Sequence, residues 1–270
     1  MLLLYYTFAT MPPLFWLAFA FIMGLCFGSF GNVLIYRMPN NASILSPPSY
    51  CPGCKNRLKP SDLIPVISWI ILRGKCRFCK KSISVRYPLI ELASGLLFLV
   101  SVLFTASLSA IPIAIFLFIL LVVSMTDWDT QEIHDKVLIF GSIVGVLWSG
   151  FGGHDFFPYA PHWTDALLGV VAGALPLFLI DRITILLLKK DGFGYGDVKL
   201  MAMVGLFLGW QLTLVAFVFA FMFGGLFGAF LMLTKKVGRG SYIAFGPFLC
   251  AGTALSLFFG EVFIAMLFNM

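Results

Sequence analysis

Charged residues are scarce in this chain of 270 residues. Asp, Glu, Lys and Arg make up 11% of it, whereas a soluble globular protein contains about 25%. This deficit argues against a soluble globular domain, a disordered chain or a nucleic-acid-binding protein. The apolar runs also lack alternation with polar residues, which argues against an outer-membrane β-barrel. The composition therefore predicts an all-α polytopic membrane protein.

Apolar residues make up 60% of the chain, or about 162 residues. Because one helical span needs about 20 apolar residues, we predict about eight transmembrane helices. Lys199 and Lys235 should lie on the same side of the membrane, so we divide the apolar stretch between them into two short helices that turn at Trp210 and Gln211. The predicted spans are residues 14–36, 88–107, 109–126, 136–151, 164–180, 198–209, 212–234 and 242–268.

Basic residues are absent from alternate connections between these spans. All 18 Lys and Arg fall in or beside residues 37–86, 127–136, 181–199 and 235–239, which alternating spans place on one side. Cytoplasmic loops of membrane proteins are enriched in Lys and Arg. We therefore expect these four segments in the cytoplasm and both termini outside. The first residues lack a basic region and a cleavage site, so we expect no removable signal peptide.

Residues 37–86 form the one connection long enough for a small soluble subdomain. It carries two Cys-x-x-Cys pairs, Cys51 with Cys54 and Cys76 with Cys79. Two such pairs can supply four thiolates to one tetrahedral structural zinc ion. Two disulfides or four inert thiols are the alternatives, but the cytoplasm is reducing and disfavours disulfides. The zinc would serve folding, because a loop of this length has no core of its own.

Acidic residues are few, and two of them lie at the ends of predicted spans. Asp127 follows the third apolar run, and Asp197 closes the glycine-rich segment 192–197. Gly194 and Gly196 permit a close backbone approach there. Two carboxylates brought together can share one proton, so that one acts as a base on water and the other as an acid on a carbonyl. This pattern favours peptide hydrolysis by an aspartyl dyad. The alternative is that these acids merely solvate a loop opposite Lys136 and Lys199.

Several motifs in order resemble those of the bacterial prepilin peptidases, which are bifunctional leader peptidase/N-methyltransferases of type IV pilus and type II secretion systems. The shared segments are GSFGNVLIYRMP at 28–39, both Cys-x-x-Cys pairs with LIPVISW at 63–69, RYPLIELASG at 86–95, the segment after Asp127, and GYGDVKL at 194–200. The resemblance covers most of the chain. It implies eight spans and an active site at the cytoplasmic face of the bacterial inner membrane.

The resemblance also implies the roles of individual residues. Asp127 and Asp197 would form the catalytic dyad, with Gly194, Gly196 and Lys199 in the active-site loop. The substrate would be a type IV prepilin or pseudopilin, cut at a Gly-Phe type bond after its basic leader. The new N-terminus would then be methylated with S-adenosylmethionine. Residues 1–96 would carry the methyltransferase-associated region, with no contact residue identified for S-adenosylmethionine, and residues 97–270 the peptidase.

One departure from the family pattern lies beside the first aspartate. The family commonly has Pro-Asp where this chain has His134-Asp135, so the local turn and the cleavage activity can differ. Asp129 is the rival of Asp127 as the catalytic group.

Two other functions stay open: a peptidase without methylation, and a non-enzymatic zinc-bearing scaffold or transporter. Transporters often contain inverted repeats, but only one half of this chain carries a cysteine loop, which disfavours the transporter. A lipid bilayer and a pilin substrate are the expected partners, with no nucleic acid. The oligomeric state stays open.

Overall fold

The computed structural model describes residues 13–105, 107–151, 159–189, 194–234 and 244–268. Among these residues there is no β-strand, and only two isolated bridges occur, both in the cysteine-rich loop. The chain divides into two compact units, residues 1–118 and 119–270. The all-α class predicted from composition is confirmed.

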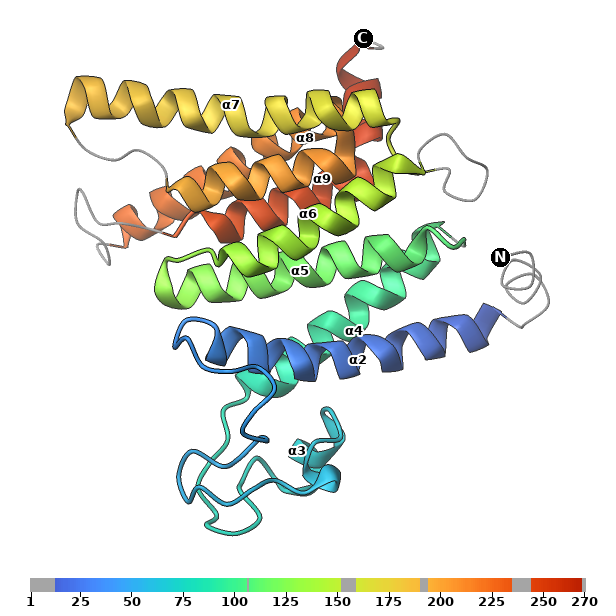
Figure 1. The fold of residues 1–270 in the computed structure, drawn as a ribbon, viewed down its shortest axis with the longest axis vertical. Helices are drawn as coiled ribbons and strands as arrows, with labels where there is room; N and C mark the ends of the chain where they lie inside the picture. The colour runs from blue at the N-terminus through green and yellow to red at the C-terminus, as the bar shows by residue number, and fades with distance from the viewer. Residues whose placement is uncertain (1–12, 106, 152–158, 190–193, 235–243, 269–270) are drawn as a thin grey trace. The chain divides into compact units, whose positions relative to one another are not determined.

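Long helices follow the apolar runs, and a long loop with two short helices joins the first two of them (Figure 1). The helices are α2 (Pro13–Arg37), η1 (Pro60–Asp62), α3 (Ile67–Ile71), α4 (Arg86–Thr105), α5 (Ala110–Thr130), α6 (Asp135–Gly150), α7 (Trp163–Leu188), α8 (Tyr195–Leu233) and α9 (Gly246–Phe268).

Six of the helices in the described part of the chain are long and apolar enough to cross a membrane: α2, α4, α5, α7, α8 and α9. Two further spans would bring this number to the predicted eight. One is α6, which has 16 residues, and the other would come from dividing α8, which has 39. The count of eight stays a prediction.

Helix α8 reverses direction near its middle. Gly209 has a φ of 72° and interrupts the helical dihedrals. On either side of it, Met201 and Thr213 both lie against Gly173 of α7. Twelve helical residues would separate those two positions by about 18 Å in a straight helix, so the chain must fold back between them. We predicted such a pair of short helices, but the turn lies at Gly209, one residue before the predicted Trp210 and Gln211.

Several helices extend past the predicted ends of the spans. Helix α5 continues through Asp127 and Asp129, which therefore lie in its last turns. Helix α7 continues to Leu188 and includes Asp181, a residue that we expected in a connection. The apolar residues that follow Asp181 explain the difference, because they continue the helix. The predicted basic segment 235–239 lies outside the described residues.

Small residues bring α2 and α4 together in the first unit. A Cβ atom at Gly24 would lie 2.6 Å from the carbonyl oxygen of Ser94, and one at Gly28 would lie 2.6 Å from the Cα of Glu91. Glycines four residues apart on one helix face permit such close packing in membranes. This contact places Glu91 directly beside α2. Glu91 lies near the start of α4, at the end that we predict to be close to the cytoplasm.

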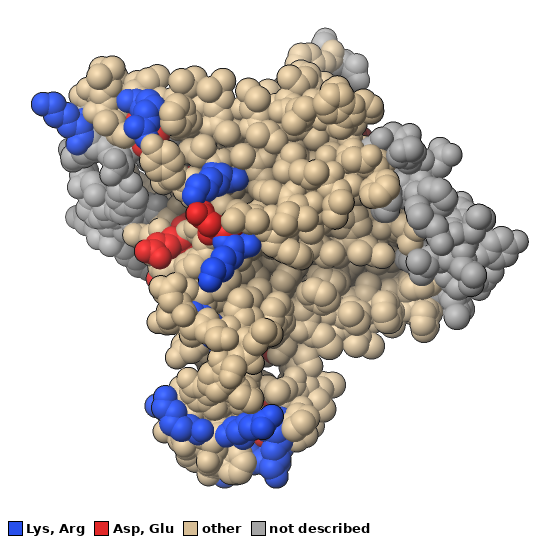
Figure 2. Space-filling view, in the orientation of Figure 1, with Lys and Arg blue, Asp and Glu red and all other residues tan. Residues whose placement is uncertain are grey.

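The first half of α8 lies at the centre of the second unit. It packs against α6 and α7, and its residues between Leu200 and Leu208 are almost all buried. A helix that is apolar all round is typical of such a central position. On the face that Figure 2 shows, a group of Lys, Arg, Asp and Glu side chains lies at one end of these helices. Asp197 begins this central helix and therefore lies at that charged end.

The closest helix contact in this unit leads to a prediction. A Cβ atom at Gly205 would collide with backbone atoms of Gly169 in α7, whereas one at Gly225 would meet nothing within 4 Å. We expect Gly205→Ala to destabilise the protein by about 2 kcal/mol or more, because backbone atoms cannot move aside. Gly225→Ala is the matched control and should change stability by less than about 1 kcal/mol. Thermal unfolding in detergent tests both variants, and equal melting temperatures would contradict the packing.

Candidate active site and metal centre

Asp127 is a buried carboxylate near the end of an apolar helix. It lies in the last turn of α5 and is 6% exposed. Its Oδ2 accepts a hydrogen bond of 3.0 Å from the backbone N–H of Gly246, at the start of α9. A helix start offers unsatisfied N–H groups and favours negative charge. The fold therefore holds this carboxylate by one oxygen at the start of another helix.

Asp197 lies in the first turn of the central helix α8. Its backbone N–H bonds to the carbonyl oxygen of Gly194 at 3.0 Å. A Cβ atom at Gly194 would lie 3.8 Å from Oδ2 of Asp197, and one at Gly196 would lie 2.9 Å from the Cβ of Ile133. The glycine at 196 thus permits the close approach that the sequence predicted. Gly194 has an ordinary φ of −71° and precedes the first residue of α8.

Tyr195 anchors the start of α8 to α7. Its hydroxyl accepts a hydrogen bond from the guanidinium of Arg182, and that guanidinium also lies 5.3 Å from the centre of its ring. Asp181 forms an ion pair of 3.2 Å with Arg182. These contacts position the turn that carries Asp197. The sequence analysis did not identify Tyr195 or Arg182, because the partners lie on different helices and form no local motif.

The structure brings Asp127 and Asp197 together, and the two carboxylates interact electrostatically. The buried thiol of Cys250 from α9 interacts with both and hydrogen-bonds to the backbone of Ser124. The position of Cys250 near the carboxylates is a feature that the sequence did not reveal. Two carboxylates that come within hydrogen-bond reach can share a proton and work as a base and an acid.

The other acidic residues near this pair are exposed. Asp129 is exposed although it lies only two residues after Asp127. Asp135 forms an ion pair with Lys199, with Nζ–Oδ distances of 2.8 and 2.9 Å, and both side chains are more than half exposed. Such an exposed pair contributes at most about 1 kcal/mol. Lys199 therefore pairs with Asp135 at the surface.

His134, which stands where the family commonly has proline, precedes α6. Its Nδ1 is buried and has no hydrogen-bond partner in the described part of the chain.

Gly246 is a site residue that the sequence analysis missed. A Cβ atom there would lie 2.6 Å from Oδ2 of Asp127, so a side chain would displace the carboxylate. The sequence offers one indication of Gly246. A glycine followed by proline stands at the start of the last apolar run, and proline is common in the first turn of a helix. Nothing local connects that pattern with an aspartate 119 residues earlier.

The second polar site is the group of four cysteines in the first unit. The sulfur atoms of Cys51, Cys54, Cys76 and Cys79 all lie within 4.8 Å of one another, and those of Cys51 and Cys79 are 3.8 Å apart. Tetrahedral zinc with bonds of about 2.3 Å separates sulfur ligands by about 3.8 Å. The cluster can therefore hold a metal ion.

The two Cys-x-x-Cys segments fold in the same way. In each, the residue after the second cysteine, Lys55 or Lys80, has a positive φ of 59° or 58°. Each lysine N–H bonds to the carbonyl of the first cysteine of its pair, at 2.8 and 3.1 Å. Isolated bridges close both turns, one of them joining Tyr50 and Arg57. Two equivalent turns present two thiols each, as a tetrahedral ion requires.

The environment of the turns alters the acidity of two thiols. The backbone N–H of Cys54 hydrogen-bonds to the sulfur of Cys51 and lowers the pKa of Cys51 to about 7. The backbone N–H of Asn56 lowers the pKa of Cys54, but burial and the neighbouring sulfurs outweigh it and raise that pKa to about 11. A metal ion needs thiolates, so the lowered pKa of Cys51 favours the ligand form of its sulfur near neutral pH.

Buried polar contacts hold the loop around the cluster. Arg37 at the end of α2 is 8% exposed, and its guanidinium donates to the carbonyl oxygens of Ser43 and Pro47 at 2.9 and 2.7 Å. Arg77 donates to Asp62 at 2.6 Å and keeps the pKa of that carboxyl below its usual value. These bonds order the loop on both sides of the thiols.

These two sites and the apolar helices define an all-helical membrane protein with paired carboxylates in one unit and a four-thiol cluster in the other. A family model for the Bacterial Peptidase A24 N-terminal domain matches residues 22–105, and one for the Type IV leader peptidase family matches residues 114–229. The chain belongs to the type IV leader peptidase family, as the motifs predicted.

Relatives match along nearly the whole chain. It is 31% identical to the prepilin leader peptidase/N-methyltransferase of Pseudomonas putida, with 95% of each chain covered. The protein of that name from Bacillus subtilis (strain 168) is 33% identical, with 94% of this chain and 98% of the relative covered. The one from Stutzerimonas stutzeri is 35% identical over 92% of each. No solved structure matches the chain.

Membership in this family distinguishes an enzyme from a non-enzymatic scaffold or transporter. The chain is an enzyme of the inner membrane with several membrane helices, and its relatives combine leader cleavage with N-methylation. The non-enzymatic scaffold or transporter is therefore wrong.

Proposed function

We propose that Asp127 and Asp197 are the catalytic dyad of a prepilin peptidase. The substrate is a type IV prepilin or pseudopilin, and the bond that is cut follows the basic leader at a Gly-Phe type junction. The observation that carries the proposal is that two carboxylates from different helices lie near enough in the second unit to interact electrostatically. In this proposal, Gly194, Gly196 and Lys199 belong to the active-site loop, which surrounds Asp197 at the start of α8.

The chemistry requires one proton shared between the two carboxylates. One carboxylate takes a proton from water while the water oxygen attacks the scissile carbonyl carbon, and the other donates its proton to the carbonyl oxygen. The tetrahedral intermediate then collapses, the carbon–nitrogen bond breaks, and the leaving amine takes up a proton. The N–H of Gly246 holds Oδ2 of Asp127 during these steps and acts as a positioning group.

Burial favours Asp127 over its rival. Asp127 is 6% exposed and is held by Gly246, whereas Asp129 is exposed. A carboxylate within an apolar helix is costly and is typical of functional positions. An exposed carboxylate at a helix end needs no functional explanation, so Asp127 is the proposed catalytic residue.

We further propose that the first unit provides the N-methyltransferase function, with S-adenosylmethionine as the methyl donor and one structural zinc ion held by Cys51, Cys54, Cys76 and Cys79. Zinc would fix the loop, since all four ligands come from protein thiols and leave no position for catalysis. In this proposal, residues 1–96 hold the methyltransferase-associated region and 97–270 the peptidase. The active site faces the cytoplasm, and both termini face outward.

The acidity of Cys51 predicts how the zinc affinity varies with pH. Above about pH 7 the Cys51 sulfur is already a thiolate, because its pKa is lowered to about 7. Below that value zinc must displace one more proton, so the apparent affinity should fall more steeply, by up to about one further power of ten per pH unit. Competition with a chromophoric chelator across this range measures the slope. An unchanged slope through pH 7 would contradict the assigned acidity.

One assay tests both enzymatic proposals. The purified protein in detergent is incubated with a prepilin and S-adenosylmethionine, and the processed product is weighed by mass spectrometry. We expect loss of the leader together with the mass of one added methyl group. A cleaved product without the methyl group would leave a peptidase alone, and an uncut prepilin would refute the proposed peptidase.

A further inference from the structure

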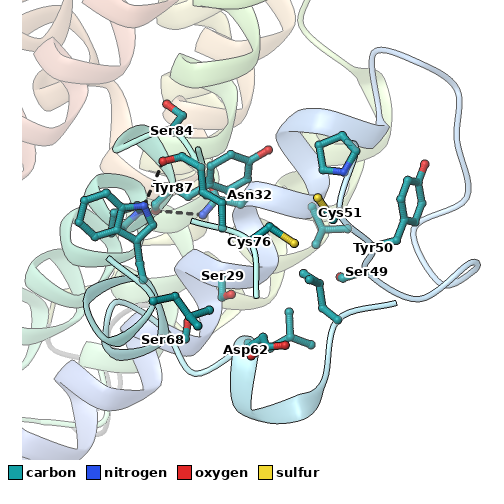
Figure 3. Close-up of a pocket in the computed structure, with 18 of the residues that line it drawn as sticks. Ser29, Asn32, Ser49, Tyr50, Cys51, Asp62, Ser68, Cys76, Ser84 and Tyr87 are labelled. Atoms are coloured by element: carbon teal, nitrogen blue, oxygen red, sulfur yellow. Dashed lines mark hydrogen bonds between the residues drawn. The ribbon is translucent and has the colours of Figure 1, made fainter. Parts of the chain in front are cut away.

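The first unit contains a cavity of about 340 Å³ beside the cysteine cluster (Figure 3). This volume lies in the range of about 300–1,000 Å³ that is typical of small-molecule sites. One wall comes from α2 and the start of α4, including Ser29, Asn32 and Glu91. The opposite wall comes from the loop, including Asp62 and Ser68. None of these residues is used by the proposed cleavage step.

The metal cluster forms part of the cavity wall. Cys51 and Cys76 line it, and they are the first and buried cysteine of each pair. A loop that loses its metal would lose the two turns in which these cysteines lie. The cavity therefore depends on the cluster, which gives the metal site a purpose beyond holding the loop together.

Aromatic rings form part of the cavity wall. Tyr36 and Tyr87 from the helices are 57% and 42% exposed, and Trp69 of α3 also lines the cavity. The indole N–H of Trp69 donates to the carbonyl of Ile83 at 3.2 Å. Gly74 lies against the same ring, so that a Cβ atom there would be 2.8 Å from Cζ2. The ring of Trp69 is thus fixed in orientation, and it offers a rigid face for stacking of a flat base or for a cation.

A buried carboxylate completes the wall. Glu91 is 8% exposed, and its Oε2 accepts a hydrogen bond of 2.7 Å from the backbone N–H of Val66. Val66 has a φ of 61°, which is strained for a β-branched residue. Such outliers persist where the surrounding structure enforces them, often at functional sites. Glu91 therefore enforces an unusual turn of the loop while it presents negative charge to a cavity lined by aromatic rings.

A carboxylate among aromatic faces is complementary to a flat ligand that carries a positive charge. S-adenosylmethionine has both parts, a purine and a sulfonium. We propose that this cavity binds S-adenosylmethionine, with the purine against the aromatic wall and the sulfonium beside Glu91, and that methyl transfer takes place there. The inference rests on the methyltransferase half of the proposed function.

The transfer itself balances without a further reactant. The unprotonated α-amine of the cleaved substrate bonds to the methyl carbon while the carbon–sulfur bond breaks. The bonding electron pair stays on sulfur, which leaves neutral S-adenosylhomocysteine, and the nitrogen releases one proton. The charge near Glu91 therefore disappears during the reaction, so the carboxylate favours the donor over the spent product.

This difference in charge provides the first test. S-adenosylmethionine and S-adenosylhomocysteine differ only by the methyl group and the sulfonium charge, and binding of each to the full-length protein in detergent is measured by equilibrium dialysis. In Glu91→Gln the amide oxygen can still accept the N–H of Val66. We expect this variant to bind S-adenosylmethionine about tenfold more weakly, with little change for S-adenosylhomocysteine. Equal weakening of both ligands would show a merely structural role and overturn the assignment of Glu91.

A matched pair of variants tests the cavity itself. Ser68 lines the cavity from α3, whereas Ile71 on the same short helix is 71% exposed and lies outside the wall. We expect Ser68→Phe to fill the cavity and abolish binding of both ligands, and Ile71→Phe to bind them as the wild type does. Metal content and limited proteolysis of the same preparations show that the loop of each variant is folded, because leader cleavage depends on the other unit. Normal binding by Ser68→Phe would overturn the proposed location.

The measurements distinguish a wrong assignment of the cavity from a wrong assignment of the methyltransferase function. A wild-type protein that methylates its product, while Glu91→Gln and Ser68→Phe bind S-adenosylmethionine normally, would refute only the cavity. A wild-type protein that binds no S-adenosylmethionine and yields an unmethylated product would refute the methyltransferase proposal and the cavity together.

Discussion

Asp127→Asn should abolish prepilin cleavage while leaving the protein folded. The substitution keeps the shape of the side chain and the acceptor for the N–H of Gly246, but it removes the carboxylate that takes or gives the proton. Loss of general acid–base catalysis costs about 10²–10⁴-fold, and we expect a loss of about a thousandfold or more. Asp197→Asn should behave in the same way, and the double variant should be no worse than either single one, because both groups act as a unit.

The matched control is Asp129→Asn, two residues along the same helix. Asp129 is exposed, and no proposed step uses it. Initial rates of leader removal in detergent are compared for the three variants, and circular dichroism with thermal unfolding verifies the fold. Full activity of Asp127→Asn combined with loss in Asp129→Asn would transfer the catalytic role to the rival residue. Retained cleavage in both Asp127→Asn and Asp197→Asn would refute the aspartyl mechanism.

Removal of metal from the cysteine cluster should abolish methylation and leave leader cleavage intact. Structural zinc sites stabilise their folded state by about 10–16 kcal/mol, far more than a loop of this size could replace. Without the metal the two turns around Cys51 and Cys76 lose their common ligand, and these cysteines line the cavity proposed for S-adenosylmethionine. Both of the aspartates proposed as catalytic belong to the other compact unit, which we expect to keep its own packing.

The double variant Cys51→Ser and Cys76→Ser tests this expectation, with Cys26→Ser as the control. Cys26 is exposed on α2 and is not part of the cluster. Metal content is measured by elemental analysis, loop order by limited proteolysis, and the two activities by product mass. We expect about one zinc per chain in the control and none in the double variant. Full methylation by a metal-free protein would refute the structural role of the cluster.

Features that depend on composition or on short spacing were predictable from the sequence. The apolar content led to the helical membrane class because a span needs only a long apolar run. The two Cys-x-x-Cys pairs led to the thiol cluster because each pair is a local turn. Asp197 was found through its adjacent glycines, and the close approach at Gly196 follows from the absence of a side chain there.

Helix lengths were less predictable than the existence of the helices. The apolar residues after Asp181 extend α7 past a charged residue that we took for a boundary. The reversal in α8 lies at Gly209, because a positive φ there costs a glycine little. The pattern of basic residues required a reversal, but it could not select one residue among several neighbours.

The tertiary structure alone decided which distant groups meet. Asp127 receives its hydrogen bond from a residue 119 positions later, and Glu91 holds Val66 from another element. Lys199, two residues after Asp197, pairs with Asp135 of another helix. The sequence by itself determined the membrane class, the thiol cluster and the candidate aspartates, since each follows from composition or local spacing. Helix packing determined the carboxylate pairing and the cavity, because contacts between helices depend on side chains far apart in the chain.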